Sequence, residues 1–207
     1  MSDHEMIAER RDVFHAVDNL TKPSNNESRA ISVAAPALRF GLRMDATAAA
    51  AAGKPAGFDL SQSINSLRQS VADAASGRLS ARLGPDEWLL IAETGADAAE
   101  ALMAGLTADL GDVAHTLVDV SHRNLAIELT GSAAADVLNT GCPLDLGDQA
   151  FPVGTATRTL FAKAEIILCR CENVGQQPLY RVECWRSFGR YMHAYLQESA
   201  ELIGARV

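Results

Sequence analysis

One stretch in the second half of the chain, residues 117–161, restricts the possible folds more than any other. It opens with two apolar, β-branched runs, and the alternation of apolar side chains in the second run is typical of a strand. A helix-forming run with a serine before it and a glycine after it comes next, followed by a loop and a Thr-rich run. The predicted order is strand 117–120, strand 125–129, helix 133–139 with Ser132 as its N-cap and Gly141 as its left-handed stop, and strand 155–161.

The rest of the chain also alternates short helices with short strands. Alternating apolar residues indicate the strands, and alanine-rich or three-to-four-residue apolar spacing indicates the helices. Within 56–76, the spacing of Ile64, Leu67 and Val71 favours a further helix. The other predicted strands are 37–43, 78–83, 88–92, 113–120, 164–171 and 179–185. The other predicted helices are 46–52 with Asp45 as N-cap, 96–110, and 188–203 with Ser187 as N-cap. Because the strands need not be parallel, this order predicts an α+β fold with mixed sheets and short helices.

The chain divides into a polar N-terminal segment and one larger domain. Residues 1–28 have only a short helical tendency, and we expect either a tail or an arm that docks on another protein; simple terminal disorder is the alternative. Residues 29–207 carry the predicted α+β domain. The element order over 78–120 is roughly echoed over 125–203, which suggests a pseudo-repeat.

Composition excludes several classes of function. The 207-residue chain has a formal net charge of −8, so a surface that neutralises nucleic-acid phosphates is not expected. It has no uninterrupted apolar window of the roughly 18–20 residues that a membrane helix needs. The first residues alternate charges and do not read as a secretory signal. We therefore expect a cytoplasmic protein without a nucleic-acid or membrane partner.

The motifs of common cofactor sites are missing from the sequence. We find no Gly-x-Gly-x-x-Gly, no phosphate-binding Gly-Lys-Ser/Thr loop, no His-Glu-x-x-His and no Gly-x-Ser-x-Gly. The four cysteines are expected to be free thiols: Cys142 has no neighbouring cation to activate it, and Cys169 and Cys171 would share one strand face. Structural zinc would need a second pair of ligands, which is absent. We expect no catalytic, cofactor-binding or metal-binding residue in this chain.

Three adjacent polar residues, Ser121, His122 and Arg123, follow the predicted strand 113–120 and are the most tempting catalytic candidates. Neighbouring side chains at a strand end point in opposite directions, so Ser121 and His122 cannot readily form a nucleophile–base pair. We expect instead an exposed cluster that makes loop or interface hydrogen bonds.

Five other polar or aromatic residues have two interpretations each. Arg158 and Arg186 could bind an anion near a helix N-terminus, or could tie loops together or meet a partner's carboxylates. Asp145 is expected to cap its own loop. Trp88 and Trp185 are expected to anchor the core or an interface rather than to stack on a substrate.

Five segments taken together resemble the gamma subunit of heterotetrameric sarcosine oxidase. They keep the order of that family and cover roughly residues 83 to 196. The segments are LGPDEWLL (83–90), DVSHRN (119–124), GCPLDL (141–146), FPVGTATRT (151–159) and WRSF (185–188).

The resemblance implies a cytoplasmic assembly of four different subunits that oxidatively demethylates sarcosine. The products are glycine, hydrogen peroxide and a one-carbon unit that passes to tetrahydrofolate. FAD, FMN, NAD, tetrahydrofolate and zinc would belong to the partner alpha, beta and delta subunits. The fold implied for the gamma subunit is similar to the folate-binding domain of glycine-cleavage aminomethyltransferases, and its role is that of a non-catalytic structural partner.

If this is correct, the conserved-looking loops would contact the large subunits. The residues predicted for such an interface are Trp88, Ser121, His122, Arg123, Asp145, Arg158 and Arg186. One alternative is the equivalent subunit of a related secondary-amine oxidase. The other is a free-standing folate- or one-carbon-binding protein, which would need a carboxylate such as Asp119 or Asp145 to hold the pterin ring.

Overall fold

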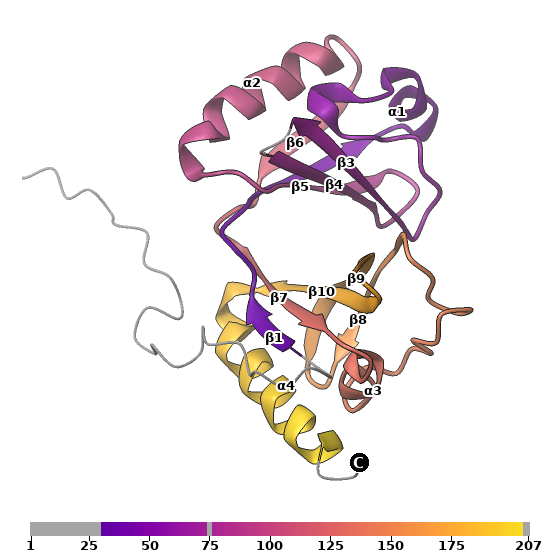
Figure 1. Ribbon diagram of the computed structural model, residues 1–207. Coiled ribbons are helices and arrows are strands. Elements are labelled where there is room, and N and C mark those ends of the chain that lie inside the picture. The colour runs from indigo at the N-terminus through magenta and orange to yellow at the C-terminus, as the bar shows by residue number, and fades with distance from the viewer. Residues whose placement is uncertain (1–29, 74–75, 205–207) are drawn as a thin grey trace, which may run out of the picture.

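Two groups of five antiparallel strands make up the body of the protein. The structure is a computed structural model and describes residues 30–73 and 76–204. One group has the order β3 (Ser66–Asp73), β4 (Ser76–Arg82), β5 (Glu87–Ala92), β2 (Leu38–Met44), β6 (His115–Asp119). The other has the order β8 (Thr155–Phe161), β9 (Ala164–Val174), β10 (Gln177–Trp185), β7 (Asn124–Thr130), β1 (Ala30–Val33). The groups join through one register pair, Ser66 with Thr155, so the molecule has two lobes (Figure 1).

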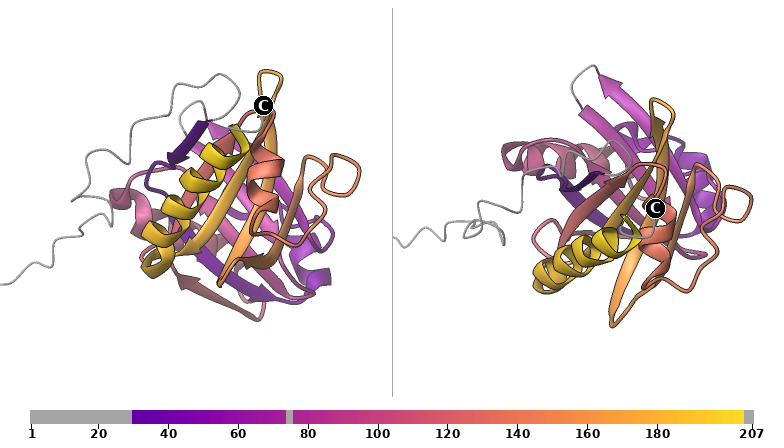
Figure 2. Two further views of the ribbon diagram at one scale, coloured as in Figure 1. Left: turned by 90° about the horizontal axis from the view of Figure 1, so that it is seen from below. Right: turned by 60° about the horizontal axis from the view of Figure 1, so that its bottom comes forward.

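Helices cover the outer face of each sheet. The first lobe (residues 38–119) carries α1 (Ala46–Ala52), the 3-10 turns η1 (Pro55–Gly57) and η2 (Ala96–Ala98), and α2 (Ala99–Leu110). The second lobe (residues 124–204 with β1) carries α3 (Ala134–Asn139), the 3-10 turn η3 (Arg186–Phe188) and α4 (Gly189–Gly204). Helices α3 and α4 lie side by side across the second sheet (Figure 2). No helix of the described residues is long and apolar enough to cross a membrane.

The two lobes share one arrangement of elements. The order β2-α1-β3-β4-β5-α2-β6 in the first lobe is matched by β7-α3-β8-β9-β10-α4 in the second, and the strands occupy equivalent places in their sheets. The place of β6 is taken in the second sheet by β1, which comes from the N-terminal side of the first lobe. The correspondence therefore begins at β2 and β7, whereas the pseudo-repeat was predicted over 78–120 and 125–203. Common ancestry of the two halves stays a prediction.

Three apolar cores hold the layers together. Leu38, Phe40 and Leu42 alternate along β2 toward α1 and α2 in the first core, and a second core lies between the other sheet and α3 and α4. The third core lies between the two sheets and includes residues such as Leu67, Ile91, Leu79, Ala156 and Cys169. Each sheet is thus covered on both faces, and fully burying one Leu or Phe side chain contributes about 1.5–3 kcal/mol.

Most of the predicted strands and helices are present in the structure, with one clear exception in the first lobe. Helix α1 is as predicted: Asp45 Oδ1 accepts from the N–H groups of Thr47 and Ala48 at 2.9 and 3.1 Å. The helix predicted within 56–76 is wrong, because residues 66–73 form β3 between β4 and β8. Ile64 is 46% exposed, while Leu67 is buried between the sheets, so the helical spacing marks no common face.

Three predicted helix-end signals were also wrong. Helix α3 has Ala133 at its N-cap and no side-chain cap, so Ser132 does not cap it. Ser187 lies inside η3, because the helical run begins earlier, at Arg186. Gly141 has no left-handed backbone; a Cβ there would meet the ring of Phe161 at 3.0 Å, so the glycine is needed for close packing. The tail or arm predicted over 1–28 lies outside the described residues.

A row of charged side chains is buried between the lobes. Arg39 of β2 forms a two-pronged ion pair with Glu183 of β10, Nε to Oε2 at 2.6 Å and Nη2 to Oε1 at 3.1 Å. Arg181 Nε contacts the same carboxylate at 2.9 Å, and its Nη1 lies 2.8 Å from Glu128 and 3.5 Å from Glu93. The side chains of Arg39, Glu183 and Arg181 are 3%, 0% and 3% exposed. This set of five residues is the inter-lobe ion network.

The pKa values of Glu183 and Arg181 reflect the balance between burial and ion pairing at the centre of the network. Burial acts to raise the pKa of Glu183, but the charges of Arg39 and Arg181 outweigh it, so the pKa lies below its ordinary value. Burial opposes the charge of Arg181, and Glu183 and Glu128 overcome it, so the pKa of Arg181 is raised. Removing one partner would leave a buried charge without its counter-ion, and this destabilises a folded protein strongly.

Replacing Glu183 should therefore destabilise the protein strongly. We expect Glu183→Ala to lower the free energy of unfolding by about 3–5 kcal/mol, because Arg39 and Arg181 lose their shared counter-ion. Glu165→Ala is the matched control, since Glu165 also pairs with an arginine but is exposed, and it should cost about 0–1 kcal/mol. Urea unfolding followed by circular dichroism measures both. Equal losses in the two variants would contradict the assigned role.

Acid should weaken the same network. Because the pKa of Glu183 is lowered in the folded protein, its contribution is complete above the unfolded-state pKa of about 4.3 and is lost as the pH falls through the folded-state value. We expect the urea midpoint to drop below about pH 4.3. The difference in urea midpoint between the wild type and Glu183→Gln should become smaller over the same pH range. A difference that stays constant from pH 6 to pH 3 would argue against this linkage.

Candidate functional site

Trp88 is not on the surface, and its prediction as an interface residue was wrong. Its side chain is 1% exposed in the first core, and the guanidinium of Arg82 lies 4.8 Å from the centre of its ring. The reason is the position of β5, which lies between β4 and β2 and is covered on both faces. The core interpretation of this tryptophan holds, whereas Trp185, at the end of β10, is 50% exposed.

Ser121 was also predicted wrongly as exposed. The residue is buried, and its hydroxyl accepts a hydrogen bond from the backbone N–H of Arg39 at 2.9 Å. Its own N–H donates to Asp119 Oδ1 at 2.8 Å, and Arg123 N–H donates to the carbonyl of Val120 at 2.9 Å. The turn that leads from β6 to β7 is thereby fixed against β2, next to the inter-lobe ion network.

The rest of this turn faces outward and meets the start of α4. His122 and Arg123 are exposed, and Arg123 Nε donates to Asn124 Oδ1 at 3.2 Å. The backbone N–H of Arg186 donates to the carbonyl of Arg123 at 2.8 Å. Four of the seven predicted interface residues, Ser121, His122, Arg123 and Arg186, therefore lie together at one end of the space between the lobes.

Asp145 and Arg158 lie elsewhere. Asp145 Oδ1 accepts from the N–H of Gly147 at 2.9 Å, so the aspartate caps its own loop as predicted. Arg158 of β8 reaches across the lobes to Glu87 of β5, with Nη2 to Oε1 at 2.7 Å, and lies 3.6 Å from Glu165. The hydrogen bond from Arg158 lowers the pKa of Glu87. Within this chain, Arg158 links the two lobes.

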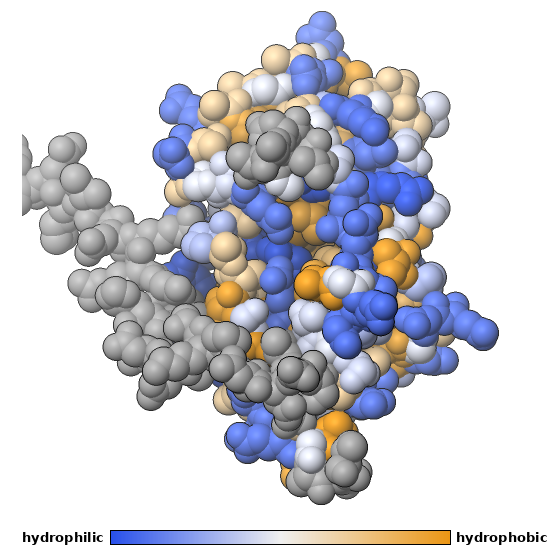
Figure 3. Space-filling model, in the orientation of Figure 1, coloured by the Kyte–Doolittle hydropathy of each residue, from blue (hydrophilic) through white to orange (hydrophobic). Residues whose placement is uncertain are grey.

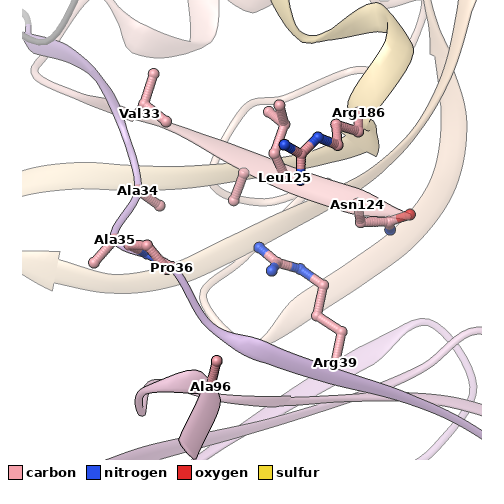
Figure 4. Close-up of a pocket in the computed structure, with 10 residues that line it drawn as sticks. Val33, Ala34, Ala35, Pro36, Arg39, Ala96, Asn124, Leu125 and Arg186 are labelled. Carbon is pink, nitrogen blue, oxygen red and sulfur yellow. The ribbon is translucent and has the colours of Figure 1, made fainter. Parts of the chain in front are cut away.

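A cavity of about 250 Å³ opens between the lobes beside this turn (Figure 4). Its walls come from the β1–β2 connection, the first residues of β7, η2 and the start of the α4 run. Arg39 and Arg186 extend toward it from β2 and from η3 (Figure 4). In the orientation of Figure 1, hydrophilic residues occupy the hollow between the lobes (Figure 3). The lining residues are Val33, Ala34, Ala35, Pro36, Arg39, Ala96, Asn124, Leu125, Ala126 and Arg186.

The four cysteines are buried free thiols. Cys169 and Cys171 share the core between the sheets, as the strand spacing predicted. Burial raises the pKa of Cys169 well above its ordinary value and that of Cys171 and Cys184 to about 12. In the described part of the chain, no group of three or more His, Cys, Asp or Glu side chains is placed to hold a metal ion. Thiols in these surroundings are poor nucleophiles.

Thiol labelling at neutral pH should reflect this burial. We expect the native chain to react with none of its four thiols over minutes, and all four to react in denaturant. Burial blocks access to all four, and the raised pKa values of Cys169, Cys171 and Cys184 also suppress thiolate formation. An aromatic disulfide reagent monitored by absorbance gives the count. Rapid native labelling of one or more thiols would mean that the sheet interior opens readily.

The sequence interpretation missed Arg39, Arg181 and Glu183. Alternation along the predicted strand 179–185 puts Tyr180, Val182 and Cys184 on one face, and these residues do belong to the second core. The sequence analysis gave no role to Arg181 and Glu183 on the opposite face. The signal present in the sequence was that Arg181 and Glu183 alternate with apolar residues along a predicted strand that is followed by another apolar segment. The sequence could not show that a second sheet covers the face on which these two residues lie.

Comparison with known proteins gives consistent matches. The model of the family "sarcosine oxidase, gamma subunit" matches residues 42–201. A chain of the heterotetrameric sarcosine oxidase from Corynebacterium sp. U-96, solved in complex with pyrrole 2-carboxylate, is 26% identical with a TM-score of 0.73, over 92% of this chain and 94% of that one. No curated protein sequence matches this chain.

A second solved structure supports the fold class. The glycine cleavage system aminomethyltransferase T from Bartonella henselae superposes with a TM-score of 0.62 at 15% identity. The match covers 80% of this chain but only 44% of that protein. At this identity the likeness concerns the fold, and the predicted α+β class similar to an aminomethyltransferase domain is confirmed.

Proposed function

This chain belongs to the sarcosine oxidase gamma subunit family, and we propose that it is the structural, non-catalytic subunit of a heterotetrameric flavoenzyme that oxidises sarcosine. The observation that carries the proposal is the match with a chain of such an enzyme, in which each chain covers more than nine-tenths of the other. The partners would be the alpha, beta and delta subunits.

In the proposed assembly, molecular oxygen is reduced to hydrogen peroxide while the N-methyl group of sarcosine is oxidised. Glycine is released, and the one-carbon unit passes to tetrahydrofolate. FAD, FMN, NAD, tetrahydrofolate and zinc would be held by the partner subunits. A cytoplasmic location agrees with four reduced cysteines.

The proposed contact surface centres on the turn between the lobes. His122 and Arg123 are exposed there, and the exposed indole of Trp185 offers the kind of aromatic anchor that is common in subunit interfaces. Asp145, Arg158 and Arg186 remain proposed contacts. Trp88 and Ser121 are excluded by their burial.

The alternative of a free-standing folate-binding protein has less support. It needs a carboxylate to hold the pterin ring, but Asp119 and Asp145 each accept a hydrogen bond from their own loop and neither lines the cavity. The equivalent subunit of a related secondary-amine oxidase would share the same fold, and the amine that the assembly oxidises separates the two.

Purification of the tagged chain from its native cells tests the proposal directly. We expect a yellow preparation with three further subunits that consumes oxygen on addition of sarcosine, while the chain produced alone is colourless. Mass spectrometry and the visible spectrum report both. A colourless homogeneous chain from both sources would overturn the subunit role, and turnover of a different amine would favour the related oxidase.

Charge reversal in the exposed turn should weaken assembly rather than chemistry. We expect Arg123→Glu to reduce the affinity for the partner subunits about tenfold, as hot-spot arginines do, with turnover per bound flavin unchanged. Arg68→Glu, a charge reversal of an exposed arginine on β3, is the matched control. An Arg123→Glu assembly with full flavin content and stoichiometry but lost turnover would show that the turn takes part in chemistry.

A further inference from the structure

The cavity between the lobes has a charge pattern that its proposed structural role does not need. Two of its ten lining residues, Arg39 and Arg186, are cationic, one is the amide Asn124, and the other seven are apolar. None of these described lining residues is acidic, although acidic residues outnumber basic ones by 26 to 18 in the chain. We propose that this cavity is a binding site for a small carboxylate that carries a compact apolar group.

Arg186 is the residue that would hold the carboxylate. Its side chain is half-buried and extends toward the cavity, and within the described residues its guanidinium has no hydrogen bond or ion pair (Figure 4). A guanidinium in this state is well suited to a two-pronged bond with a carboxylate. Arg186 also begins the helical run that continues as the 16-residue α4, so the positive end of that helix adds to the attraction.

Arg39 has a different part in the site. Its Nε and Nη2 are engaged by Glu183 and its Nη1 donates to the carbonyl of Ala37 at 2.9 Å, so the side chain is fixed in place. It is therefore a positioning residue whose charge is already paired with Glu183, while Arg186 is the group available to bind.

Size and wall chemistry limit the rest of the ligand. A cavity of about 150 Å³ lined by apolar side chains is enough to hold benzene, so about 250 Å³ leaves space for one ring or a branched chain together with its carboxylate. Val33, Pro36, Leu125 and Ala126 offer the apolar contact. The fitting class is an aromatic or branched aliphatic monocarboxylate, and a larger acid would protrude through the open side.

Benzoate is the simplest probe of this class, and benzamide is its uncharged counterpart. Isothermal titration of the full chain at constant ionic strength should show saturable binding of benzoate and at least tenfold weaker binding of benzamide. Arg186→Gln should weaken benzoate binding at least tenfold, and Arg186→Lys should restore part of it. Arg190→Gln, one turn further along α4, removes the same charge outside the cavity lining and should leave the affinity unchanged.

Thermal unfolding of each variant establishes that it is folded before titration. Benzoate binding that is absent, that is equal for benzamide, or that survives Arg186→Gln would overturn the proposal. Such a failure would leave the subunit role intact, because this titration requires no partner.

The carboxylate has two conceivable sources, a free metabolite or an acidic group of a partner subunit, and a second arm separates them. Assembly with the partners is measured with benzoate or benzamide present. If benzoate alone weakens assembly, a partner's carboxylate occupies the cavity. If the assembled complex still binds benzoate through a component that Arg186→Gln removes, the natural ligand is a free carboxylate.

Discussion

The ion pair of Arg39 with Glu183 is the interaction on which the arrangement of the lobes depends. Its partners come from strands in different sheets, and the carboxylate is shared with Arg181 where water is excluded. Apolar contacts between two sheets tolerate sliding, because they are not directional. A two-pronged guanidinium–carboxylate bond has one favourable geometry, so it fixes the register of one sheet over the other. Arg158 and Glu87 form a second ion pair of this kind at another place between the lobes.

Local sequence signals predicted the elements but not how they are layered. The cap at Asp45 and the alternation along β2, β7 and β10 depend on neighbours a few residues away, and these predictions agree with the structure. The strand β3 was taken for a helix because its partners β4 and β8 decide its conformation. Trp88 and Ser121 were placed at an interface because nothing in the sequence shows that Trp88 packs into the core beneath the helices of the first lobe, or that Ser121 turns inward against β2. The resemblance to a family predicted the multi-subunit enzyme to which the chain would belong. The inter-lobe ion network and the cavity could be found only in the three-dimensional structure.

The same layering decides how the reactive side chains of the described residues are used. These groups make contacts within the chain. The cysteines are buried in the cores, Ser121 fixes a turn, and several arginines form ion pairs with carboxylates of the same chain. Arg186 differs from these paired arginines, because within the described residues its guanidinium has no hydrogen bond or ion pair and it lines the cavity between the lobes. A cation placed in this way is suited to receive an anion.

The pairing of β1 with a strand far along the chain has a consequence for folding during synthesis on the ribosome. Ala30 pairs with Thr130 and Val33 with Ile127, so one of the earliest segments to be synthesised completes a sheet whose remaining strands emerge much later. The first lobe has all of its strands by residue 119, whereas β1 pairs with β7 of the second lobe. Closing such a long loop is slow, so the second lobe is the late and aggregation-exposed half of the chain. Pairing of β1 with β7 closes a connection that contains the entire first lobe.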